Sequence, residues 1–131
     1  MTKTIYQKYN VECGYGWKSI IVPLIDYVEK YNSNHTNSNI EILQIKEKFG
    51  GLRFYVSFDN VEKDIIDQLR RMIDNAEEES FLTCEYCGNK ENVGTTLGWL
   101  TTICENCIKT NYRGTSTEWR RQKDGKIIKI K

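Results

Sequence analysis

Four cysteines in two close pairs constrain this chain more than any other feature. The pairs are Cys84-Glu85-Tyr86-Cys87 and Cys104-Glu105-Asn106-Cys107, and 16 residues lie between them. This spacing is typical of a structural zinc site, because a short turn aims two thiolates at one ion and a second pair completes a tetrahedron. Four thiolates leave no position open for water or substrate. The sequence therefore predicts a bound Zn²⁺ that stabilises the fold and takes no part in catalysis.

Two disulfides are the alternative interpretation of the same cysteines. The N-terminal residues contain no long apolar run typical of a signal peptide, and no stretch has the apolar length of a membrane span. These features favour a reducing, cytoplasmic location and no membrane partner, and in such a compartment paired cysteines are more typical of metal ligands. The fifth cysteine, Cys13, is expected to be a small buried residue.

Length and composition predict an ordinary globular domain. The chain has 131 residues, of which 39% are hydrophobic and 28% charged, and its formal net charge is +1. The charge is distributed unevenly, because residues 59–80 carry eight acids against three bases and residues 109–131 carry eight bases against two acids. Such asymmetry indicates either solvated faces or a surface for a charged partner.

Hydrophobic spacing predicts an α+β fold in three parts. Residues 1–80 are expected to form a core with a helix at 17–31, a β-hairpin at 40–58 and a helix at 59–80 that is capped by Asp59. Residues 81–112 would form a four-cysteine zinc module like a zinc ribbon or treble clef, and residues 113–131 a basic C-terminal hairpin or tail. In this fold the hairpin sheet packs on the two helices.

The hairpin has a simple expected register around Gly50-Gly51, with Phe49 opposite Leu52. This register places the following side chains on the buried face: Leu43, Ile45, Phe49, Leu52, Phe54, Val56 and Phe58. It also places Lys48 opposite Arg53 and Lys46 opposite Tyr55 on the other face.

The polar face of this hairpin is the best candidate for a binding site. Like charges directly across two strands are destabilising, so a face that keeps three cations beside an aromatic ring favours an anionic ligand with a flat part. Gly50 and Gly51 would let such a ligand approach the backbone closely. The predicted ligand-binding residues are Lys46, Lys48, Gly50, Gly51, Arg53 and Tyr55. Alternatively, the lysines only protect an exposed strand from aggregation.

Other functional classes have less support in the residues. The single histidine, His35, lies in a polar loop, and no set of side chains indicates catalysis, so we expect a protein that is not an enzyme. Trp17 and Trp99 are expected to pack internally, and Trp119 beside Arg120 and Arg121 to cover the core. The basic C-terminal segment favours a second hypothesis, a zinc-dependent regulator that binds DNA or RNA. Exposed strand edges would also permit a homo-oligomer.

One longer run of residues resembles a known group. Residues 44–56 read QIKEKFGGLRFYV, and with Gly16-Trp17, Gly98-Trp99 and the two cysteine pairs the chain resembles small, uncharacterised zinc-binding proteins encoded by bacteriophages and prophages. The resemblance covers about residues 14–107 and does not extend to the basic segment that follows. It implies a protein in the cytoplasm of a host cell that binds a nucleotide signal or a host defence protein and so inhibits bacterial antiviral defence.

Overall fold

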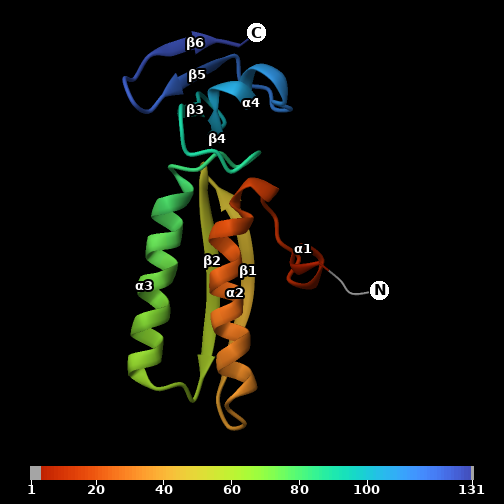
Figure 1. Cartoon of the computed structure of the whole chain (residues 1–131), viewed down its shortest axis with the longest axis vertical. Helices are drawn as coiled ribbons and strands as arrows, with labels where there is room; N and C mark the ends of the chain where they lie inside the picture. The colour runs from red at the N-terminus through yellow and green to blue at the C-terminus, as the bar shows by residue number, and fades with distance from the viewer. Residues whose placement is uncertain (1–3, 131) are drawn as a thin grey trace.

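Two small antiparallel sheets and four α-helices make up residues 4–130, the part of the chain that this computed structural model describes. Residues 1–3 and 131, which belong to the predicted terminal segments, lie outside it. One end of the elongated molecule holds a two-stranded hairpin and two long helices, and the other end holds a four-stranded sheet and a short helix (Figure 1). The predicted mixed α+β class is confirmed.

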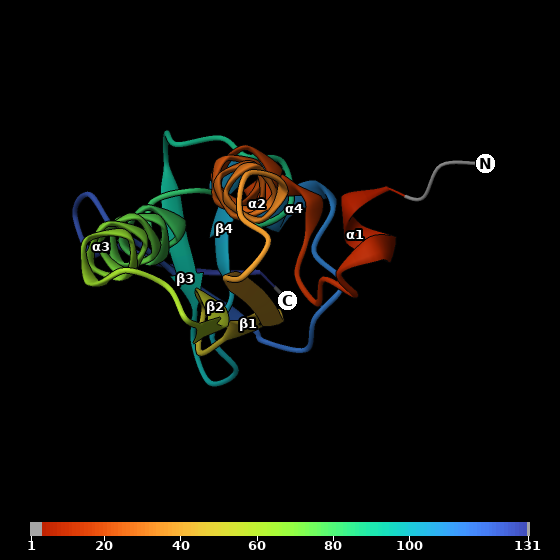
Figure 2. The same ribbon diagram turned by 90° about the horizontal axis from the view of Figure 1, so that it is seen from below.

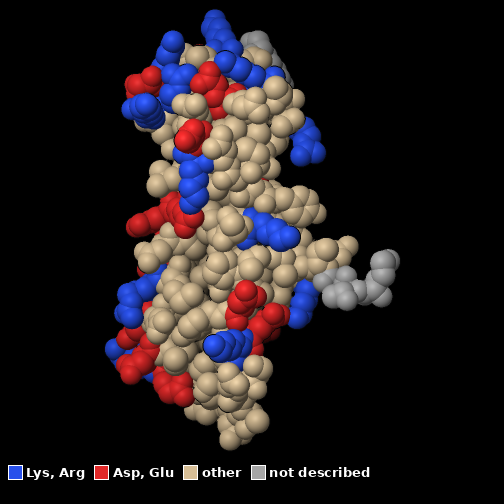
Figure 3. Space-filling view, viewed as in Figure 1, with Lys and Arg blue, Asp and Glu red and all other residues tan. Residues whose placement is uncertain are grey.

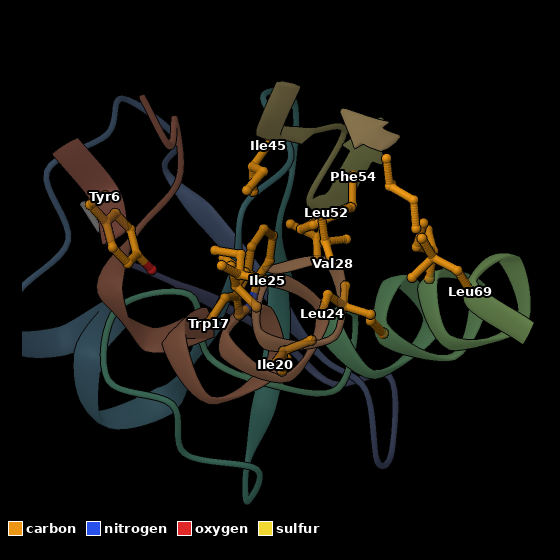
Figure 4. Packing of buried hydrophobic residues seen from close by; sticks show 14 of the residues in the cluster. Tyr6, Trp17, Ile20, Leu24, Ile25, Val28, Ile45, Leu52, Phe54 and Leu69 are labelled. Carbon is orange, nitrogen blue, oxygen red and sulfur yellow. The ribbon is translucent and has the colours of Figure 1, made fainter. Parts of the chain in front are cut away.

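The first long helix, α2, spans Lys18–Ser33 and follows a short 3₁₀ helix, η1, at Tyr15–Trp17. It contains the predicted helix at 17–31 almost entirely. Its buried side chains recur at helical spacing and form the centre of the core, together with Trp17, which is completely buried. Figure 4 shows these side chains pointing toward the hairpin on one side and toward α3 on the other.

The hairpin consists of β1, Asn39–Lys48, and β2, Gly51–Asp59. Its predicted register is wrong, because Lys48 lies opposite Gly51, and Lys46 lies opposite Arg53. The turn is formed by Phe49 and Gly50, which have φ values of 56° and 84°. A two-residue turn with positive φ at both positions matches the right-handed twist of a hairpin, so the turn begins one residue earlier than the glycine pair suggests.

A bulge also changes which side chains of β1 are buried. The register shifts between Ile42 and Gln44, so Leu43 is displaced from the core face and is 56% exposed. Phe49, in the turn, is 66% exposed, and the prediction that both residues belong to the core is wrong. Ile40 takes the place of Leu43 in the core, whereas the buried positions of β2 agree with the prediction.

The second long helix, α3, spans Lys63–Ser80. It begins later than predicted because Asp59 is the last residue of β2 and Asn60 turns with φ of 56°, so Asp59 is not its cap. The helix lies beside the free edge of β2. Ser80 accepts a hydrogen bond from the Leu52 N–H at 2.9 Å, and the Glu77 carboxylate accepts one from the Phe54 N–H at 3.1 Å. These bonds satisfy strand donors that would otherwise face solvent.

The N-terminal segment covers the opposite edge of the hairpin. The short helix α1, Ile5–Lys8, is tied to α2 by an ion pair of 2.7 Å between Lys8 and Glu29. Further along, the Glu12 N–H donates to the Ile45 carbonyl at 2.8 Å, so this residue pairs with β1 as a single bridge. Both edges of the two-stranded sheet are therefore partly covered.

The second sheet has the strand order β4-β3-β5-β6. Its strands are β3, Val93–Thr96; β4, Thr102–Cys104; β5, Glu118–Arg121; and β6, Ile127–Lys129, while α4 spans Glu105–Thr110. We call this sheet, α4 and the turn that carries Cys84 and Cys87 the cysteine module. The C-terminal hairpin is not a separate tail, because β5 pairs with β3 and Trp119 is completely buried in the module. None of the helices within residues 4–130 is long and apolar enough to cross a membrane.

Candidate functional site

The four paired cysteines meet in the cysteine module. Cys84 and Cys87 lie in the turn that follows α3, while Cys104 ends β4 and caps α4, whose first turn contains Cys107. Their sulfur atoms all lie within 4.8 Å of one another, and only Cys87 is exposed. The four residues are thus arranged so that they could hold a metal ion.

The sulfur geometry distinguishes a metal site from disulfides. The Sγ atoms of Cys87 and Cys104 are 3.7 Å apart, whereas a disulfide requires about 2.05 Å. Metal–sulfur bonds of about 2.3 Å in a tetrahedron would separate the sulfur atoms by about 3.8 Å. Donors also point at the sulfurs, since the Cys107 N–H lies 3.4 Å from Cys104 Sγ and the Asn111 Nδ2 lies 3.7 Å from Cys107 Sγ. All five cysteines are free.

The first cysteine pair is also fixed by close packing against the N-terminal segment. The Gly16 N–H donates to the Glu85 carbonyl at 2.8 Å, and the buried Trp17 Nε1 donates to the Thr83 carbonyl at 2.9 Å. A Cβ on Gly16 would lie only 2.2 Å from the Cys84 carbonyl oxygen. The Gly-x-Gly run at 14–16 therefore allows two backbones to approach each other, which sequence reasoning did not predict.

The two glycines predicted to contact a ligand are packed against other parts of this chain. Gly50 and Gly51 are both buried at the junction of the hairpin with the cysteine module. A Cβ on Gly51 would lie 2.2 Å from the ring of Phe81, and the Thr102 hydroxyl donates to the Gly50 carbonyl at 2.5 Å. Close approach is needed here, as the sequence indicates, but the approaching groups belong to the same chain.

The other predicted contacts lie on the outer face of the hairpin, which we call the hairpin face. Lys46 lies opposite Arg53, and Tyr55, which is 41% exposed, lies two residues further along β2 on the same face. Lys48 is at the turn end of this face and is not opposite Arg53. Within residues 4–130, the three cations take part in none of the ion pairs.

In the described part of the chain, three carboxylates lie near these cations without forming an ion pair with them. Glu12, the bridge partner of Lys46, accepts a hydrogen bond from Gln44 at 3.3 Å. The Glu47 carboxylate accepts a hydrogen bond from the Gly50 N–H at 2.8 Å, and Glu41 accepts one from Ser57 at 3.5 Å. The hairpin face is also open: none of the four main surface cavities is lined by any of its cations, although Tyr55 borders the groove between β2 and α3. The face is therefore a cationic surface and not a pocket.

Trp99, like Leu43 and Phe49, is placed wrongly by the sequence prediction. The sequence predicts that it packs internally, but it is 75% exposed in the loop between β3 and β4, while Trp17 and Trp119 are both completely buried as expected. The signal that could have found it is the preceding Gly98, whose φ of 84° places it in a tight turn.

His35 and Cys13 are of residue types that often act in catalysis, but neither is arranged for it here. The His35 ring stacks on Tyr31 with centroids 3.9 Å apart, and its Nδ1 lies 2.7 Å from the Tyr31 carbonyl. Cys13 is half-buried, and burial, with a further contribution from the charge of Glu85, raises the pKa of its thiol to about 12. Cys13 therefore remains a thiol at neutral pH and is a poor nucleophile.

Charge divides the surface between the two ends of the molecule. Acidic side chains gather along α3, and Lys and Arg side chains gather over the cysteine module (Figure 3). Arg121 is neutralised by Glu105 at 2.6 Å and Asp124 at 3.1 Å. The remaining cations of β5, β6 and their turn take part in none of the ion pairs of the described chain; they are Arg120, Lys123, Lys126 and Lys129.

Comparison of the chain with family models, with curated proteins and with solved structures found no match.

Proposed function

We propose that this chain is a non-enzymatic recognition protein, braced by zinc, whose hairpin face binds an anionic ligand with a flat aromatic part, such as a nucleotide. The observation that carries this proposal is the set of three cations, Lys46, Lys48 and Arg53, that take part in none of the ion pairs of residues 4–130. They share the outer face of the hairpin with Tyr55, which is 41% exposed, and Arg53 is two residues from it along β2, while Lys48 lies at the turn end. Arg can hold a phosphate through two hydrogen bonds, Lys adds a point charge, and Tyr can stack on a base.

Electrostatics favours a ligand on this face. Lys46 and Arg53 are direct cross-strand neighbours, and like charges in that position destabilise a sheet. An anion bound between the two cations would attract both of them and so offset their repulsion. The gain is available because none of the three nearby carboxylates of the described chain, Glu12, Glu41 and Glu47, forms an ion pair with these cations.

The proposed metal is Zn²⁺ in a module like a treble clef. The order of elements supports this: a cysteine pair in a turn, the β3–β4 hairpin, and a second pair at the start of α4. Four thiolates would close the coordination sphere, so the ion would stabilise the module without catalysing a reaction. Elemental analysis of the purified protein should find about one zinc per chain, and Cys107→Ser should release it and unfold the module.

The resemblance to phage proteins suggests where this recognition is used. A protein of that origin, acting in the host cytoplasm, would inhibit antiviral defence by sequestering a nucleotide signal or by blocking a host protein. The hairpin face lies within the residues that carry the resemblance.

Thermal unfolding in the presence of cyclic and linear nucleotides tests the proposal, because a ligand that binds only the folded protein raises its melting temperature. The double variant K46A/R53A should weaken binding by roughly 10- to 100-fold, as expected for the loss of one or two charge-assisted contacts. Lys63→Ala is the matched control, since Lys63 is an exposed lysine on α3. If no nucleotide raises the melting temperature, or if the double variant binds as well as the control, the proposal is wrong.

A second candidate function is DNA or RNA binding by the basic part of the cysteine module. It is favoured by the four cations of β5, β6 and their turn that take part in none of the ion pairs of the described residues. Binding of this kind should weaken steeply with salt, and R120A/K126A should lower the slope of log K against log salt by about 2. Binding that does not depend on salt would argue against it.

A further inference from the structure

We infer that the ligand of the hairpin face is a single-stranded nucleic acid whose bases stack on Tyr55, Phe49 and Trp99 while its phosphates follow the adjoining cations. This inference rests on the proposed function, since it takes the hairpin face as an anion-binding surface. It extends that surface across the turn to the β3–β4 loop and names the class of ligand.

The ring of Phe49 is exposed, whereas the turn that carries it is fixed by hydrogen bonds. Its ring is 66% exposed and lies beside Lys48, whose Nζ is 5.5 Å from the ring centroid. The turn that carries it is fixed from β1 and from the module, because the Gly50 N–H donates to the Glu47 carboxylate and the Gly50 carbonyl accepts from the Thr102 hydroxyl. An aromatic ring and a cation of the hairpin face are thus presented together.

Trp99 is presented in the same way by the β3–β4 loop. The buried Thr96 hydroxyl donates to the Trp99 carbonyl at 2.6 Å and accepts from the Thr101 N–H at 2.8 Å. Ser116 is also buried, and its hydroxyl donates to the Leu97 carbonyl at 2.8 Å. Hydrogen bonds with two buried hydroxyls therefore fix a loop whose large indole is 75% exposed. Because the backbone of this loop is already fixed, ordering it costs little entropy when a ligand binds, and the indole is presented on a preorganised segment.

The loop and the hairpin face are continuous in space. A Cβ on Gly50 would lie 3.6 Å from Leu100, the neighbour of Trp99. Figure 2 shows the β3–β4 loop extending beyond the hairpin on the side away from α2, which is the side of the hairpin face. From Tyr55 to the turn the strand spans four residues, or about 14 Å, so a ligand that reaches both rings must be longer than one nucleotide.

The distribution of charge along the hairpin face determines where a polyanion can bind. At the far end of the hairpin, Glu41 and Asp59 lie on the same face and would repel phosphates. Lys46, Arg53 and Lys48 all lie on the half nearer the turn, where the bordering acid is Glu12, the bridge partner of Lys46. A polyanion is therefore favoured from Tyr55 toward Phe49 and Trp99.

The composition of the surface favours nucleic acid over an acidic protein. The core of a protein interface is aromatic and poor in charge, whereas here cations lie among the aromatic rings. Rings and cations together on an open surface are typical of proteins that bind single strands without strong sequence preference.

Fluorescence of the intact, metal-loaded protein tests the inference directly. Trp17 and Trp119 are completely buried, so quenching by an added oligonucleotide reports on Trp99. The probes are dTMP and the oligonucleotides dT4, dT8 and dT16, measured at two salt concentrations. We expect affinity to rise with length and to fall with salt, and tryptophan emission to be quenched.

Trp99→Ala should reduce the affinity for dT16 roughly 5- to 150-fold, which corresponds to the loss of one stacked base. Tyr15→Ala is the matched control, because Tyr15 is 73% exposed but lies outside this surface. If dT16 binds no better than dTMP, the inference is wrong while the proposed function stands. If R120A/K126A abolishes binding and Trp99→Ala does not, the strand binds elsewhere and the inference is wrong. Displacement of dT16 by poly-glutamate at equal charge concentration would indicate an acidic protein partner instead, and absence of binding by every nucleotide would overturn both proposals.

Discussion

Replacing Gly16 by alanine should destabilise the protein severely, because this glycine lies where the N-terminal segment meets the first cysteine pair. The new Cβ would lie 2.2 Å from the Cys84 carbonyl oxygen and 2.5 Å from that of Glu85. A carbon and a carbonyl oxygen normally approach no closer than about 3.3 Å, so the two backbones must separate by about 1 Å. Neither neighbouring atom is the end of a flexible side chain that could move aside.

The magnitude follows from two losses. Overpacking in a tight contact costs about 1–3 kcal/mol. Separation also breaks the 2.8 Å hydrogen bond from the Gly16 N–H to the Glu85 carbonyl and strains the bond from Trp17 to Thr83, which adds about 1–3 kcal/mol. The free energy of unfolding should therefore fall by about 2–6 kcal/mol.

Urea unfolding of the metal-loaded protein, followed by tryptophan emission, measures this loss. With an m-value of about 2 kcal/mol/M the midpoint should fall by about 1–3 M. Gly98→Ala is the control: its Cβ would meet nothing within 4 Å, but its φ of 84° is unfavourable for alanine, so only about 1 kcal/mol should be lost. If Gly16→Ala lowers the free energy of unfolding by less than Gly98→Ala does, the close approach of the two backbones at Gly16 is not important for stability.

Three further predictions concern other parts of the chain. Cys13, whose pKa is raised to about 12 by burial, should stay unmodified by iodoacetamide near neutral pH, and mass spectrometry that finds it alkylated in the folded protein would contradict this. Ser80→Ala leaves the buried Leu52 N–H without its acceptor and should lower the free energy of unfolding by about 1–3 kcal/mol in a urea titration. The hydrogen bond from Lys8 lowers the pKa of Glu29, so this ion pair stabilises the fold above the ordinary pKa of about 4.3 and the contribution is lost as pH falls through the lowered value. Because the pair is exposed, Glu29→Gln should cost less than about 1 kcal/mol at neutral pH, and the difference from wild type should shrink as the pH falls below the ordinary pKa of the carboxyl, as melts across an acidic pH series would show.

The four-cysteine cluster is the part of the molecule most accessible to sequence reasoning. The spacing within each pair is local, since Cys84 and Cys87 lie in one turn and Cys104 and Cys107 at the start of one helix. It can therefore be recognised without knowledge of the long-range contacts of the fold. The pairing of β3 with β5 is not predicted, because it joins segments far apart along the chain and no local pattern specifies it.

The register error at the hairpin has a tertiary cause. The pair Gly50-Gly51 suggests a turn, but only Gly50 is in the turn, and Gly51 is the first residue of β2. Gly51 is needed because the ring of Phe81, a residue beyond the end of α3, occupies the space of a side chain. The sequence pattern does not distinguish a glycine required for packing from a glycine required for turning. The lysines and the arginine of the hairpin face remain on one side despite this error, because a slip by two residues preserves alternation.

The hydrogen bond from Thr102 to Gly50 connects the cysteine module, where an ion would bind, with the hairpin, where a guest would bind. Thr102 lies two residues before Cys104, so the strand that delivers a sulfur atom also clamps the end of the hairpin. Linkage is reciprocal: if the ion rigidifies the clamp and thereby favours a guest on the hairpin, the guest must retain the ion by the same factor. Supply of the metal in the cell would then regulate recognition, and a chelator would act as an antagonist without touching the recognition surface.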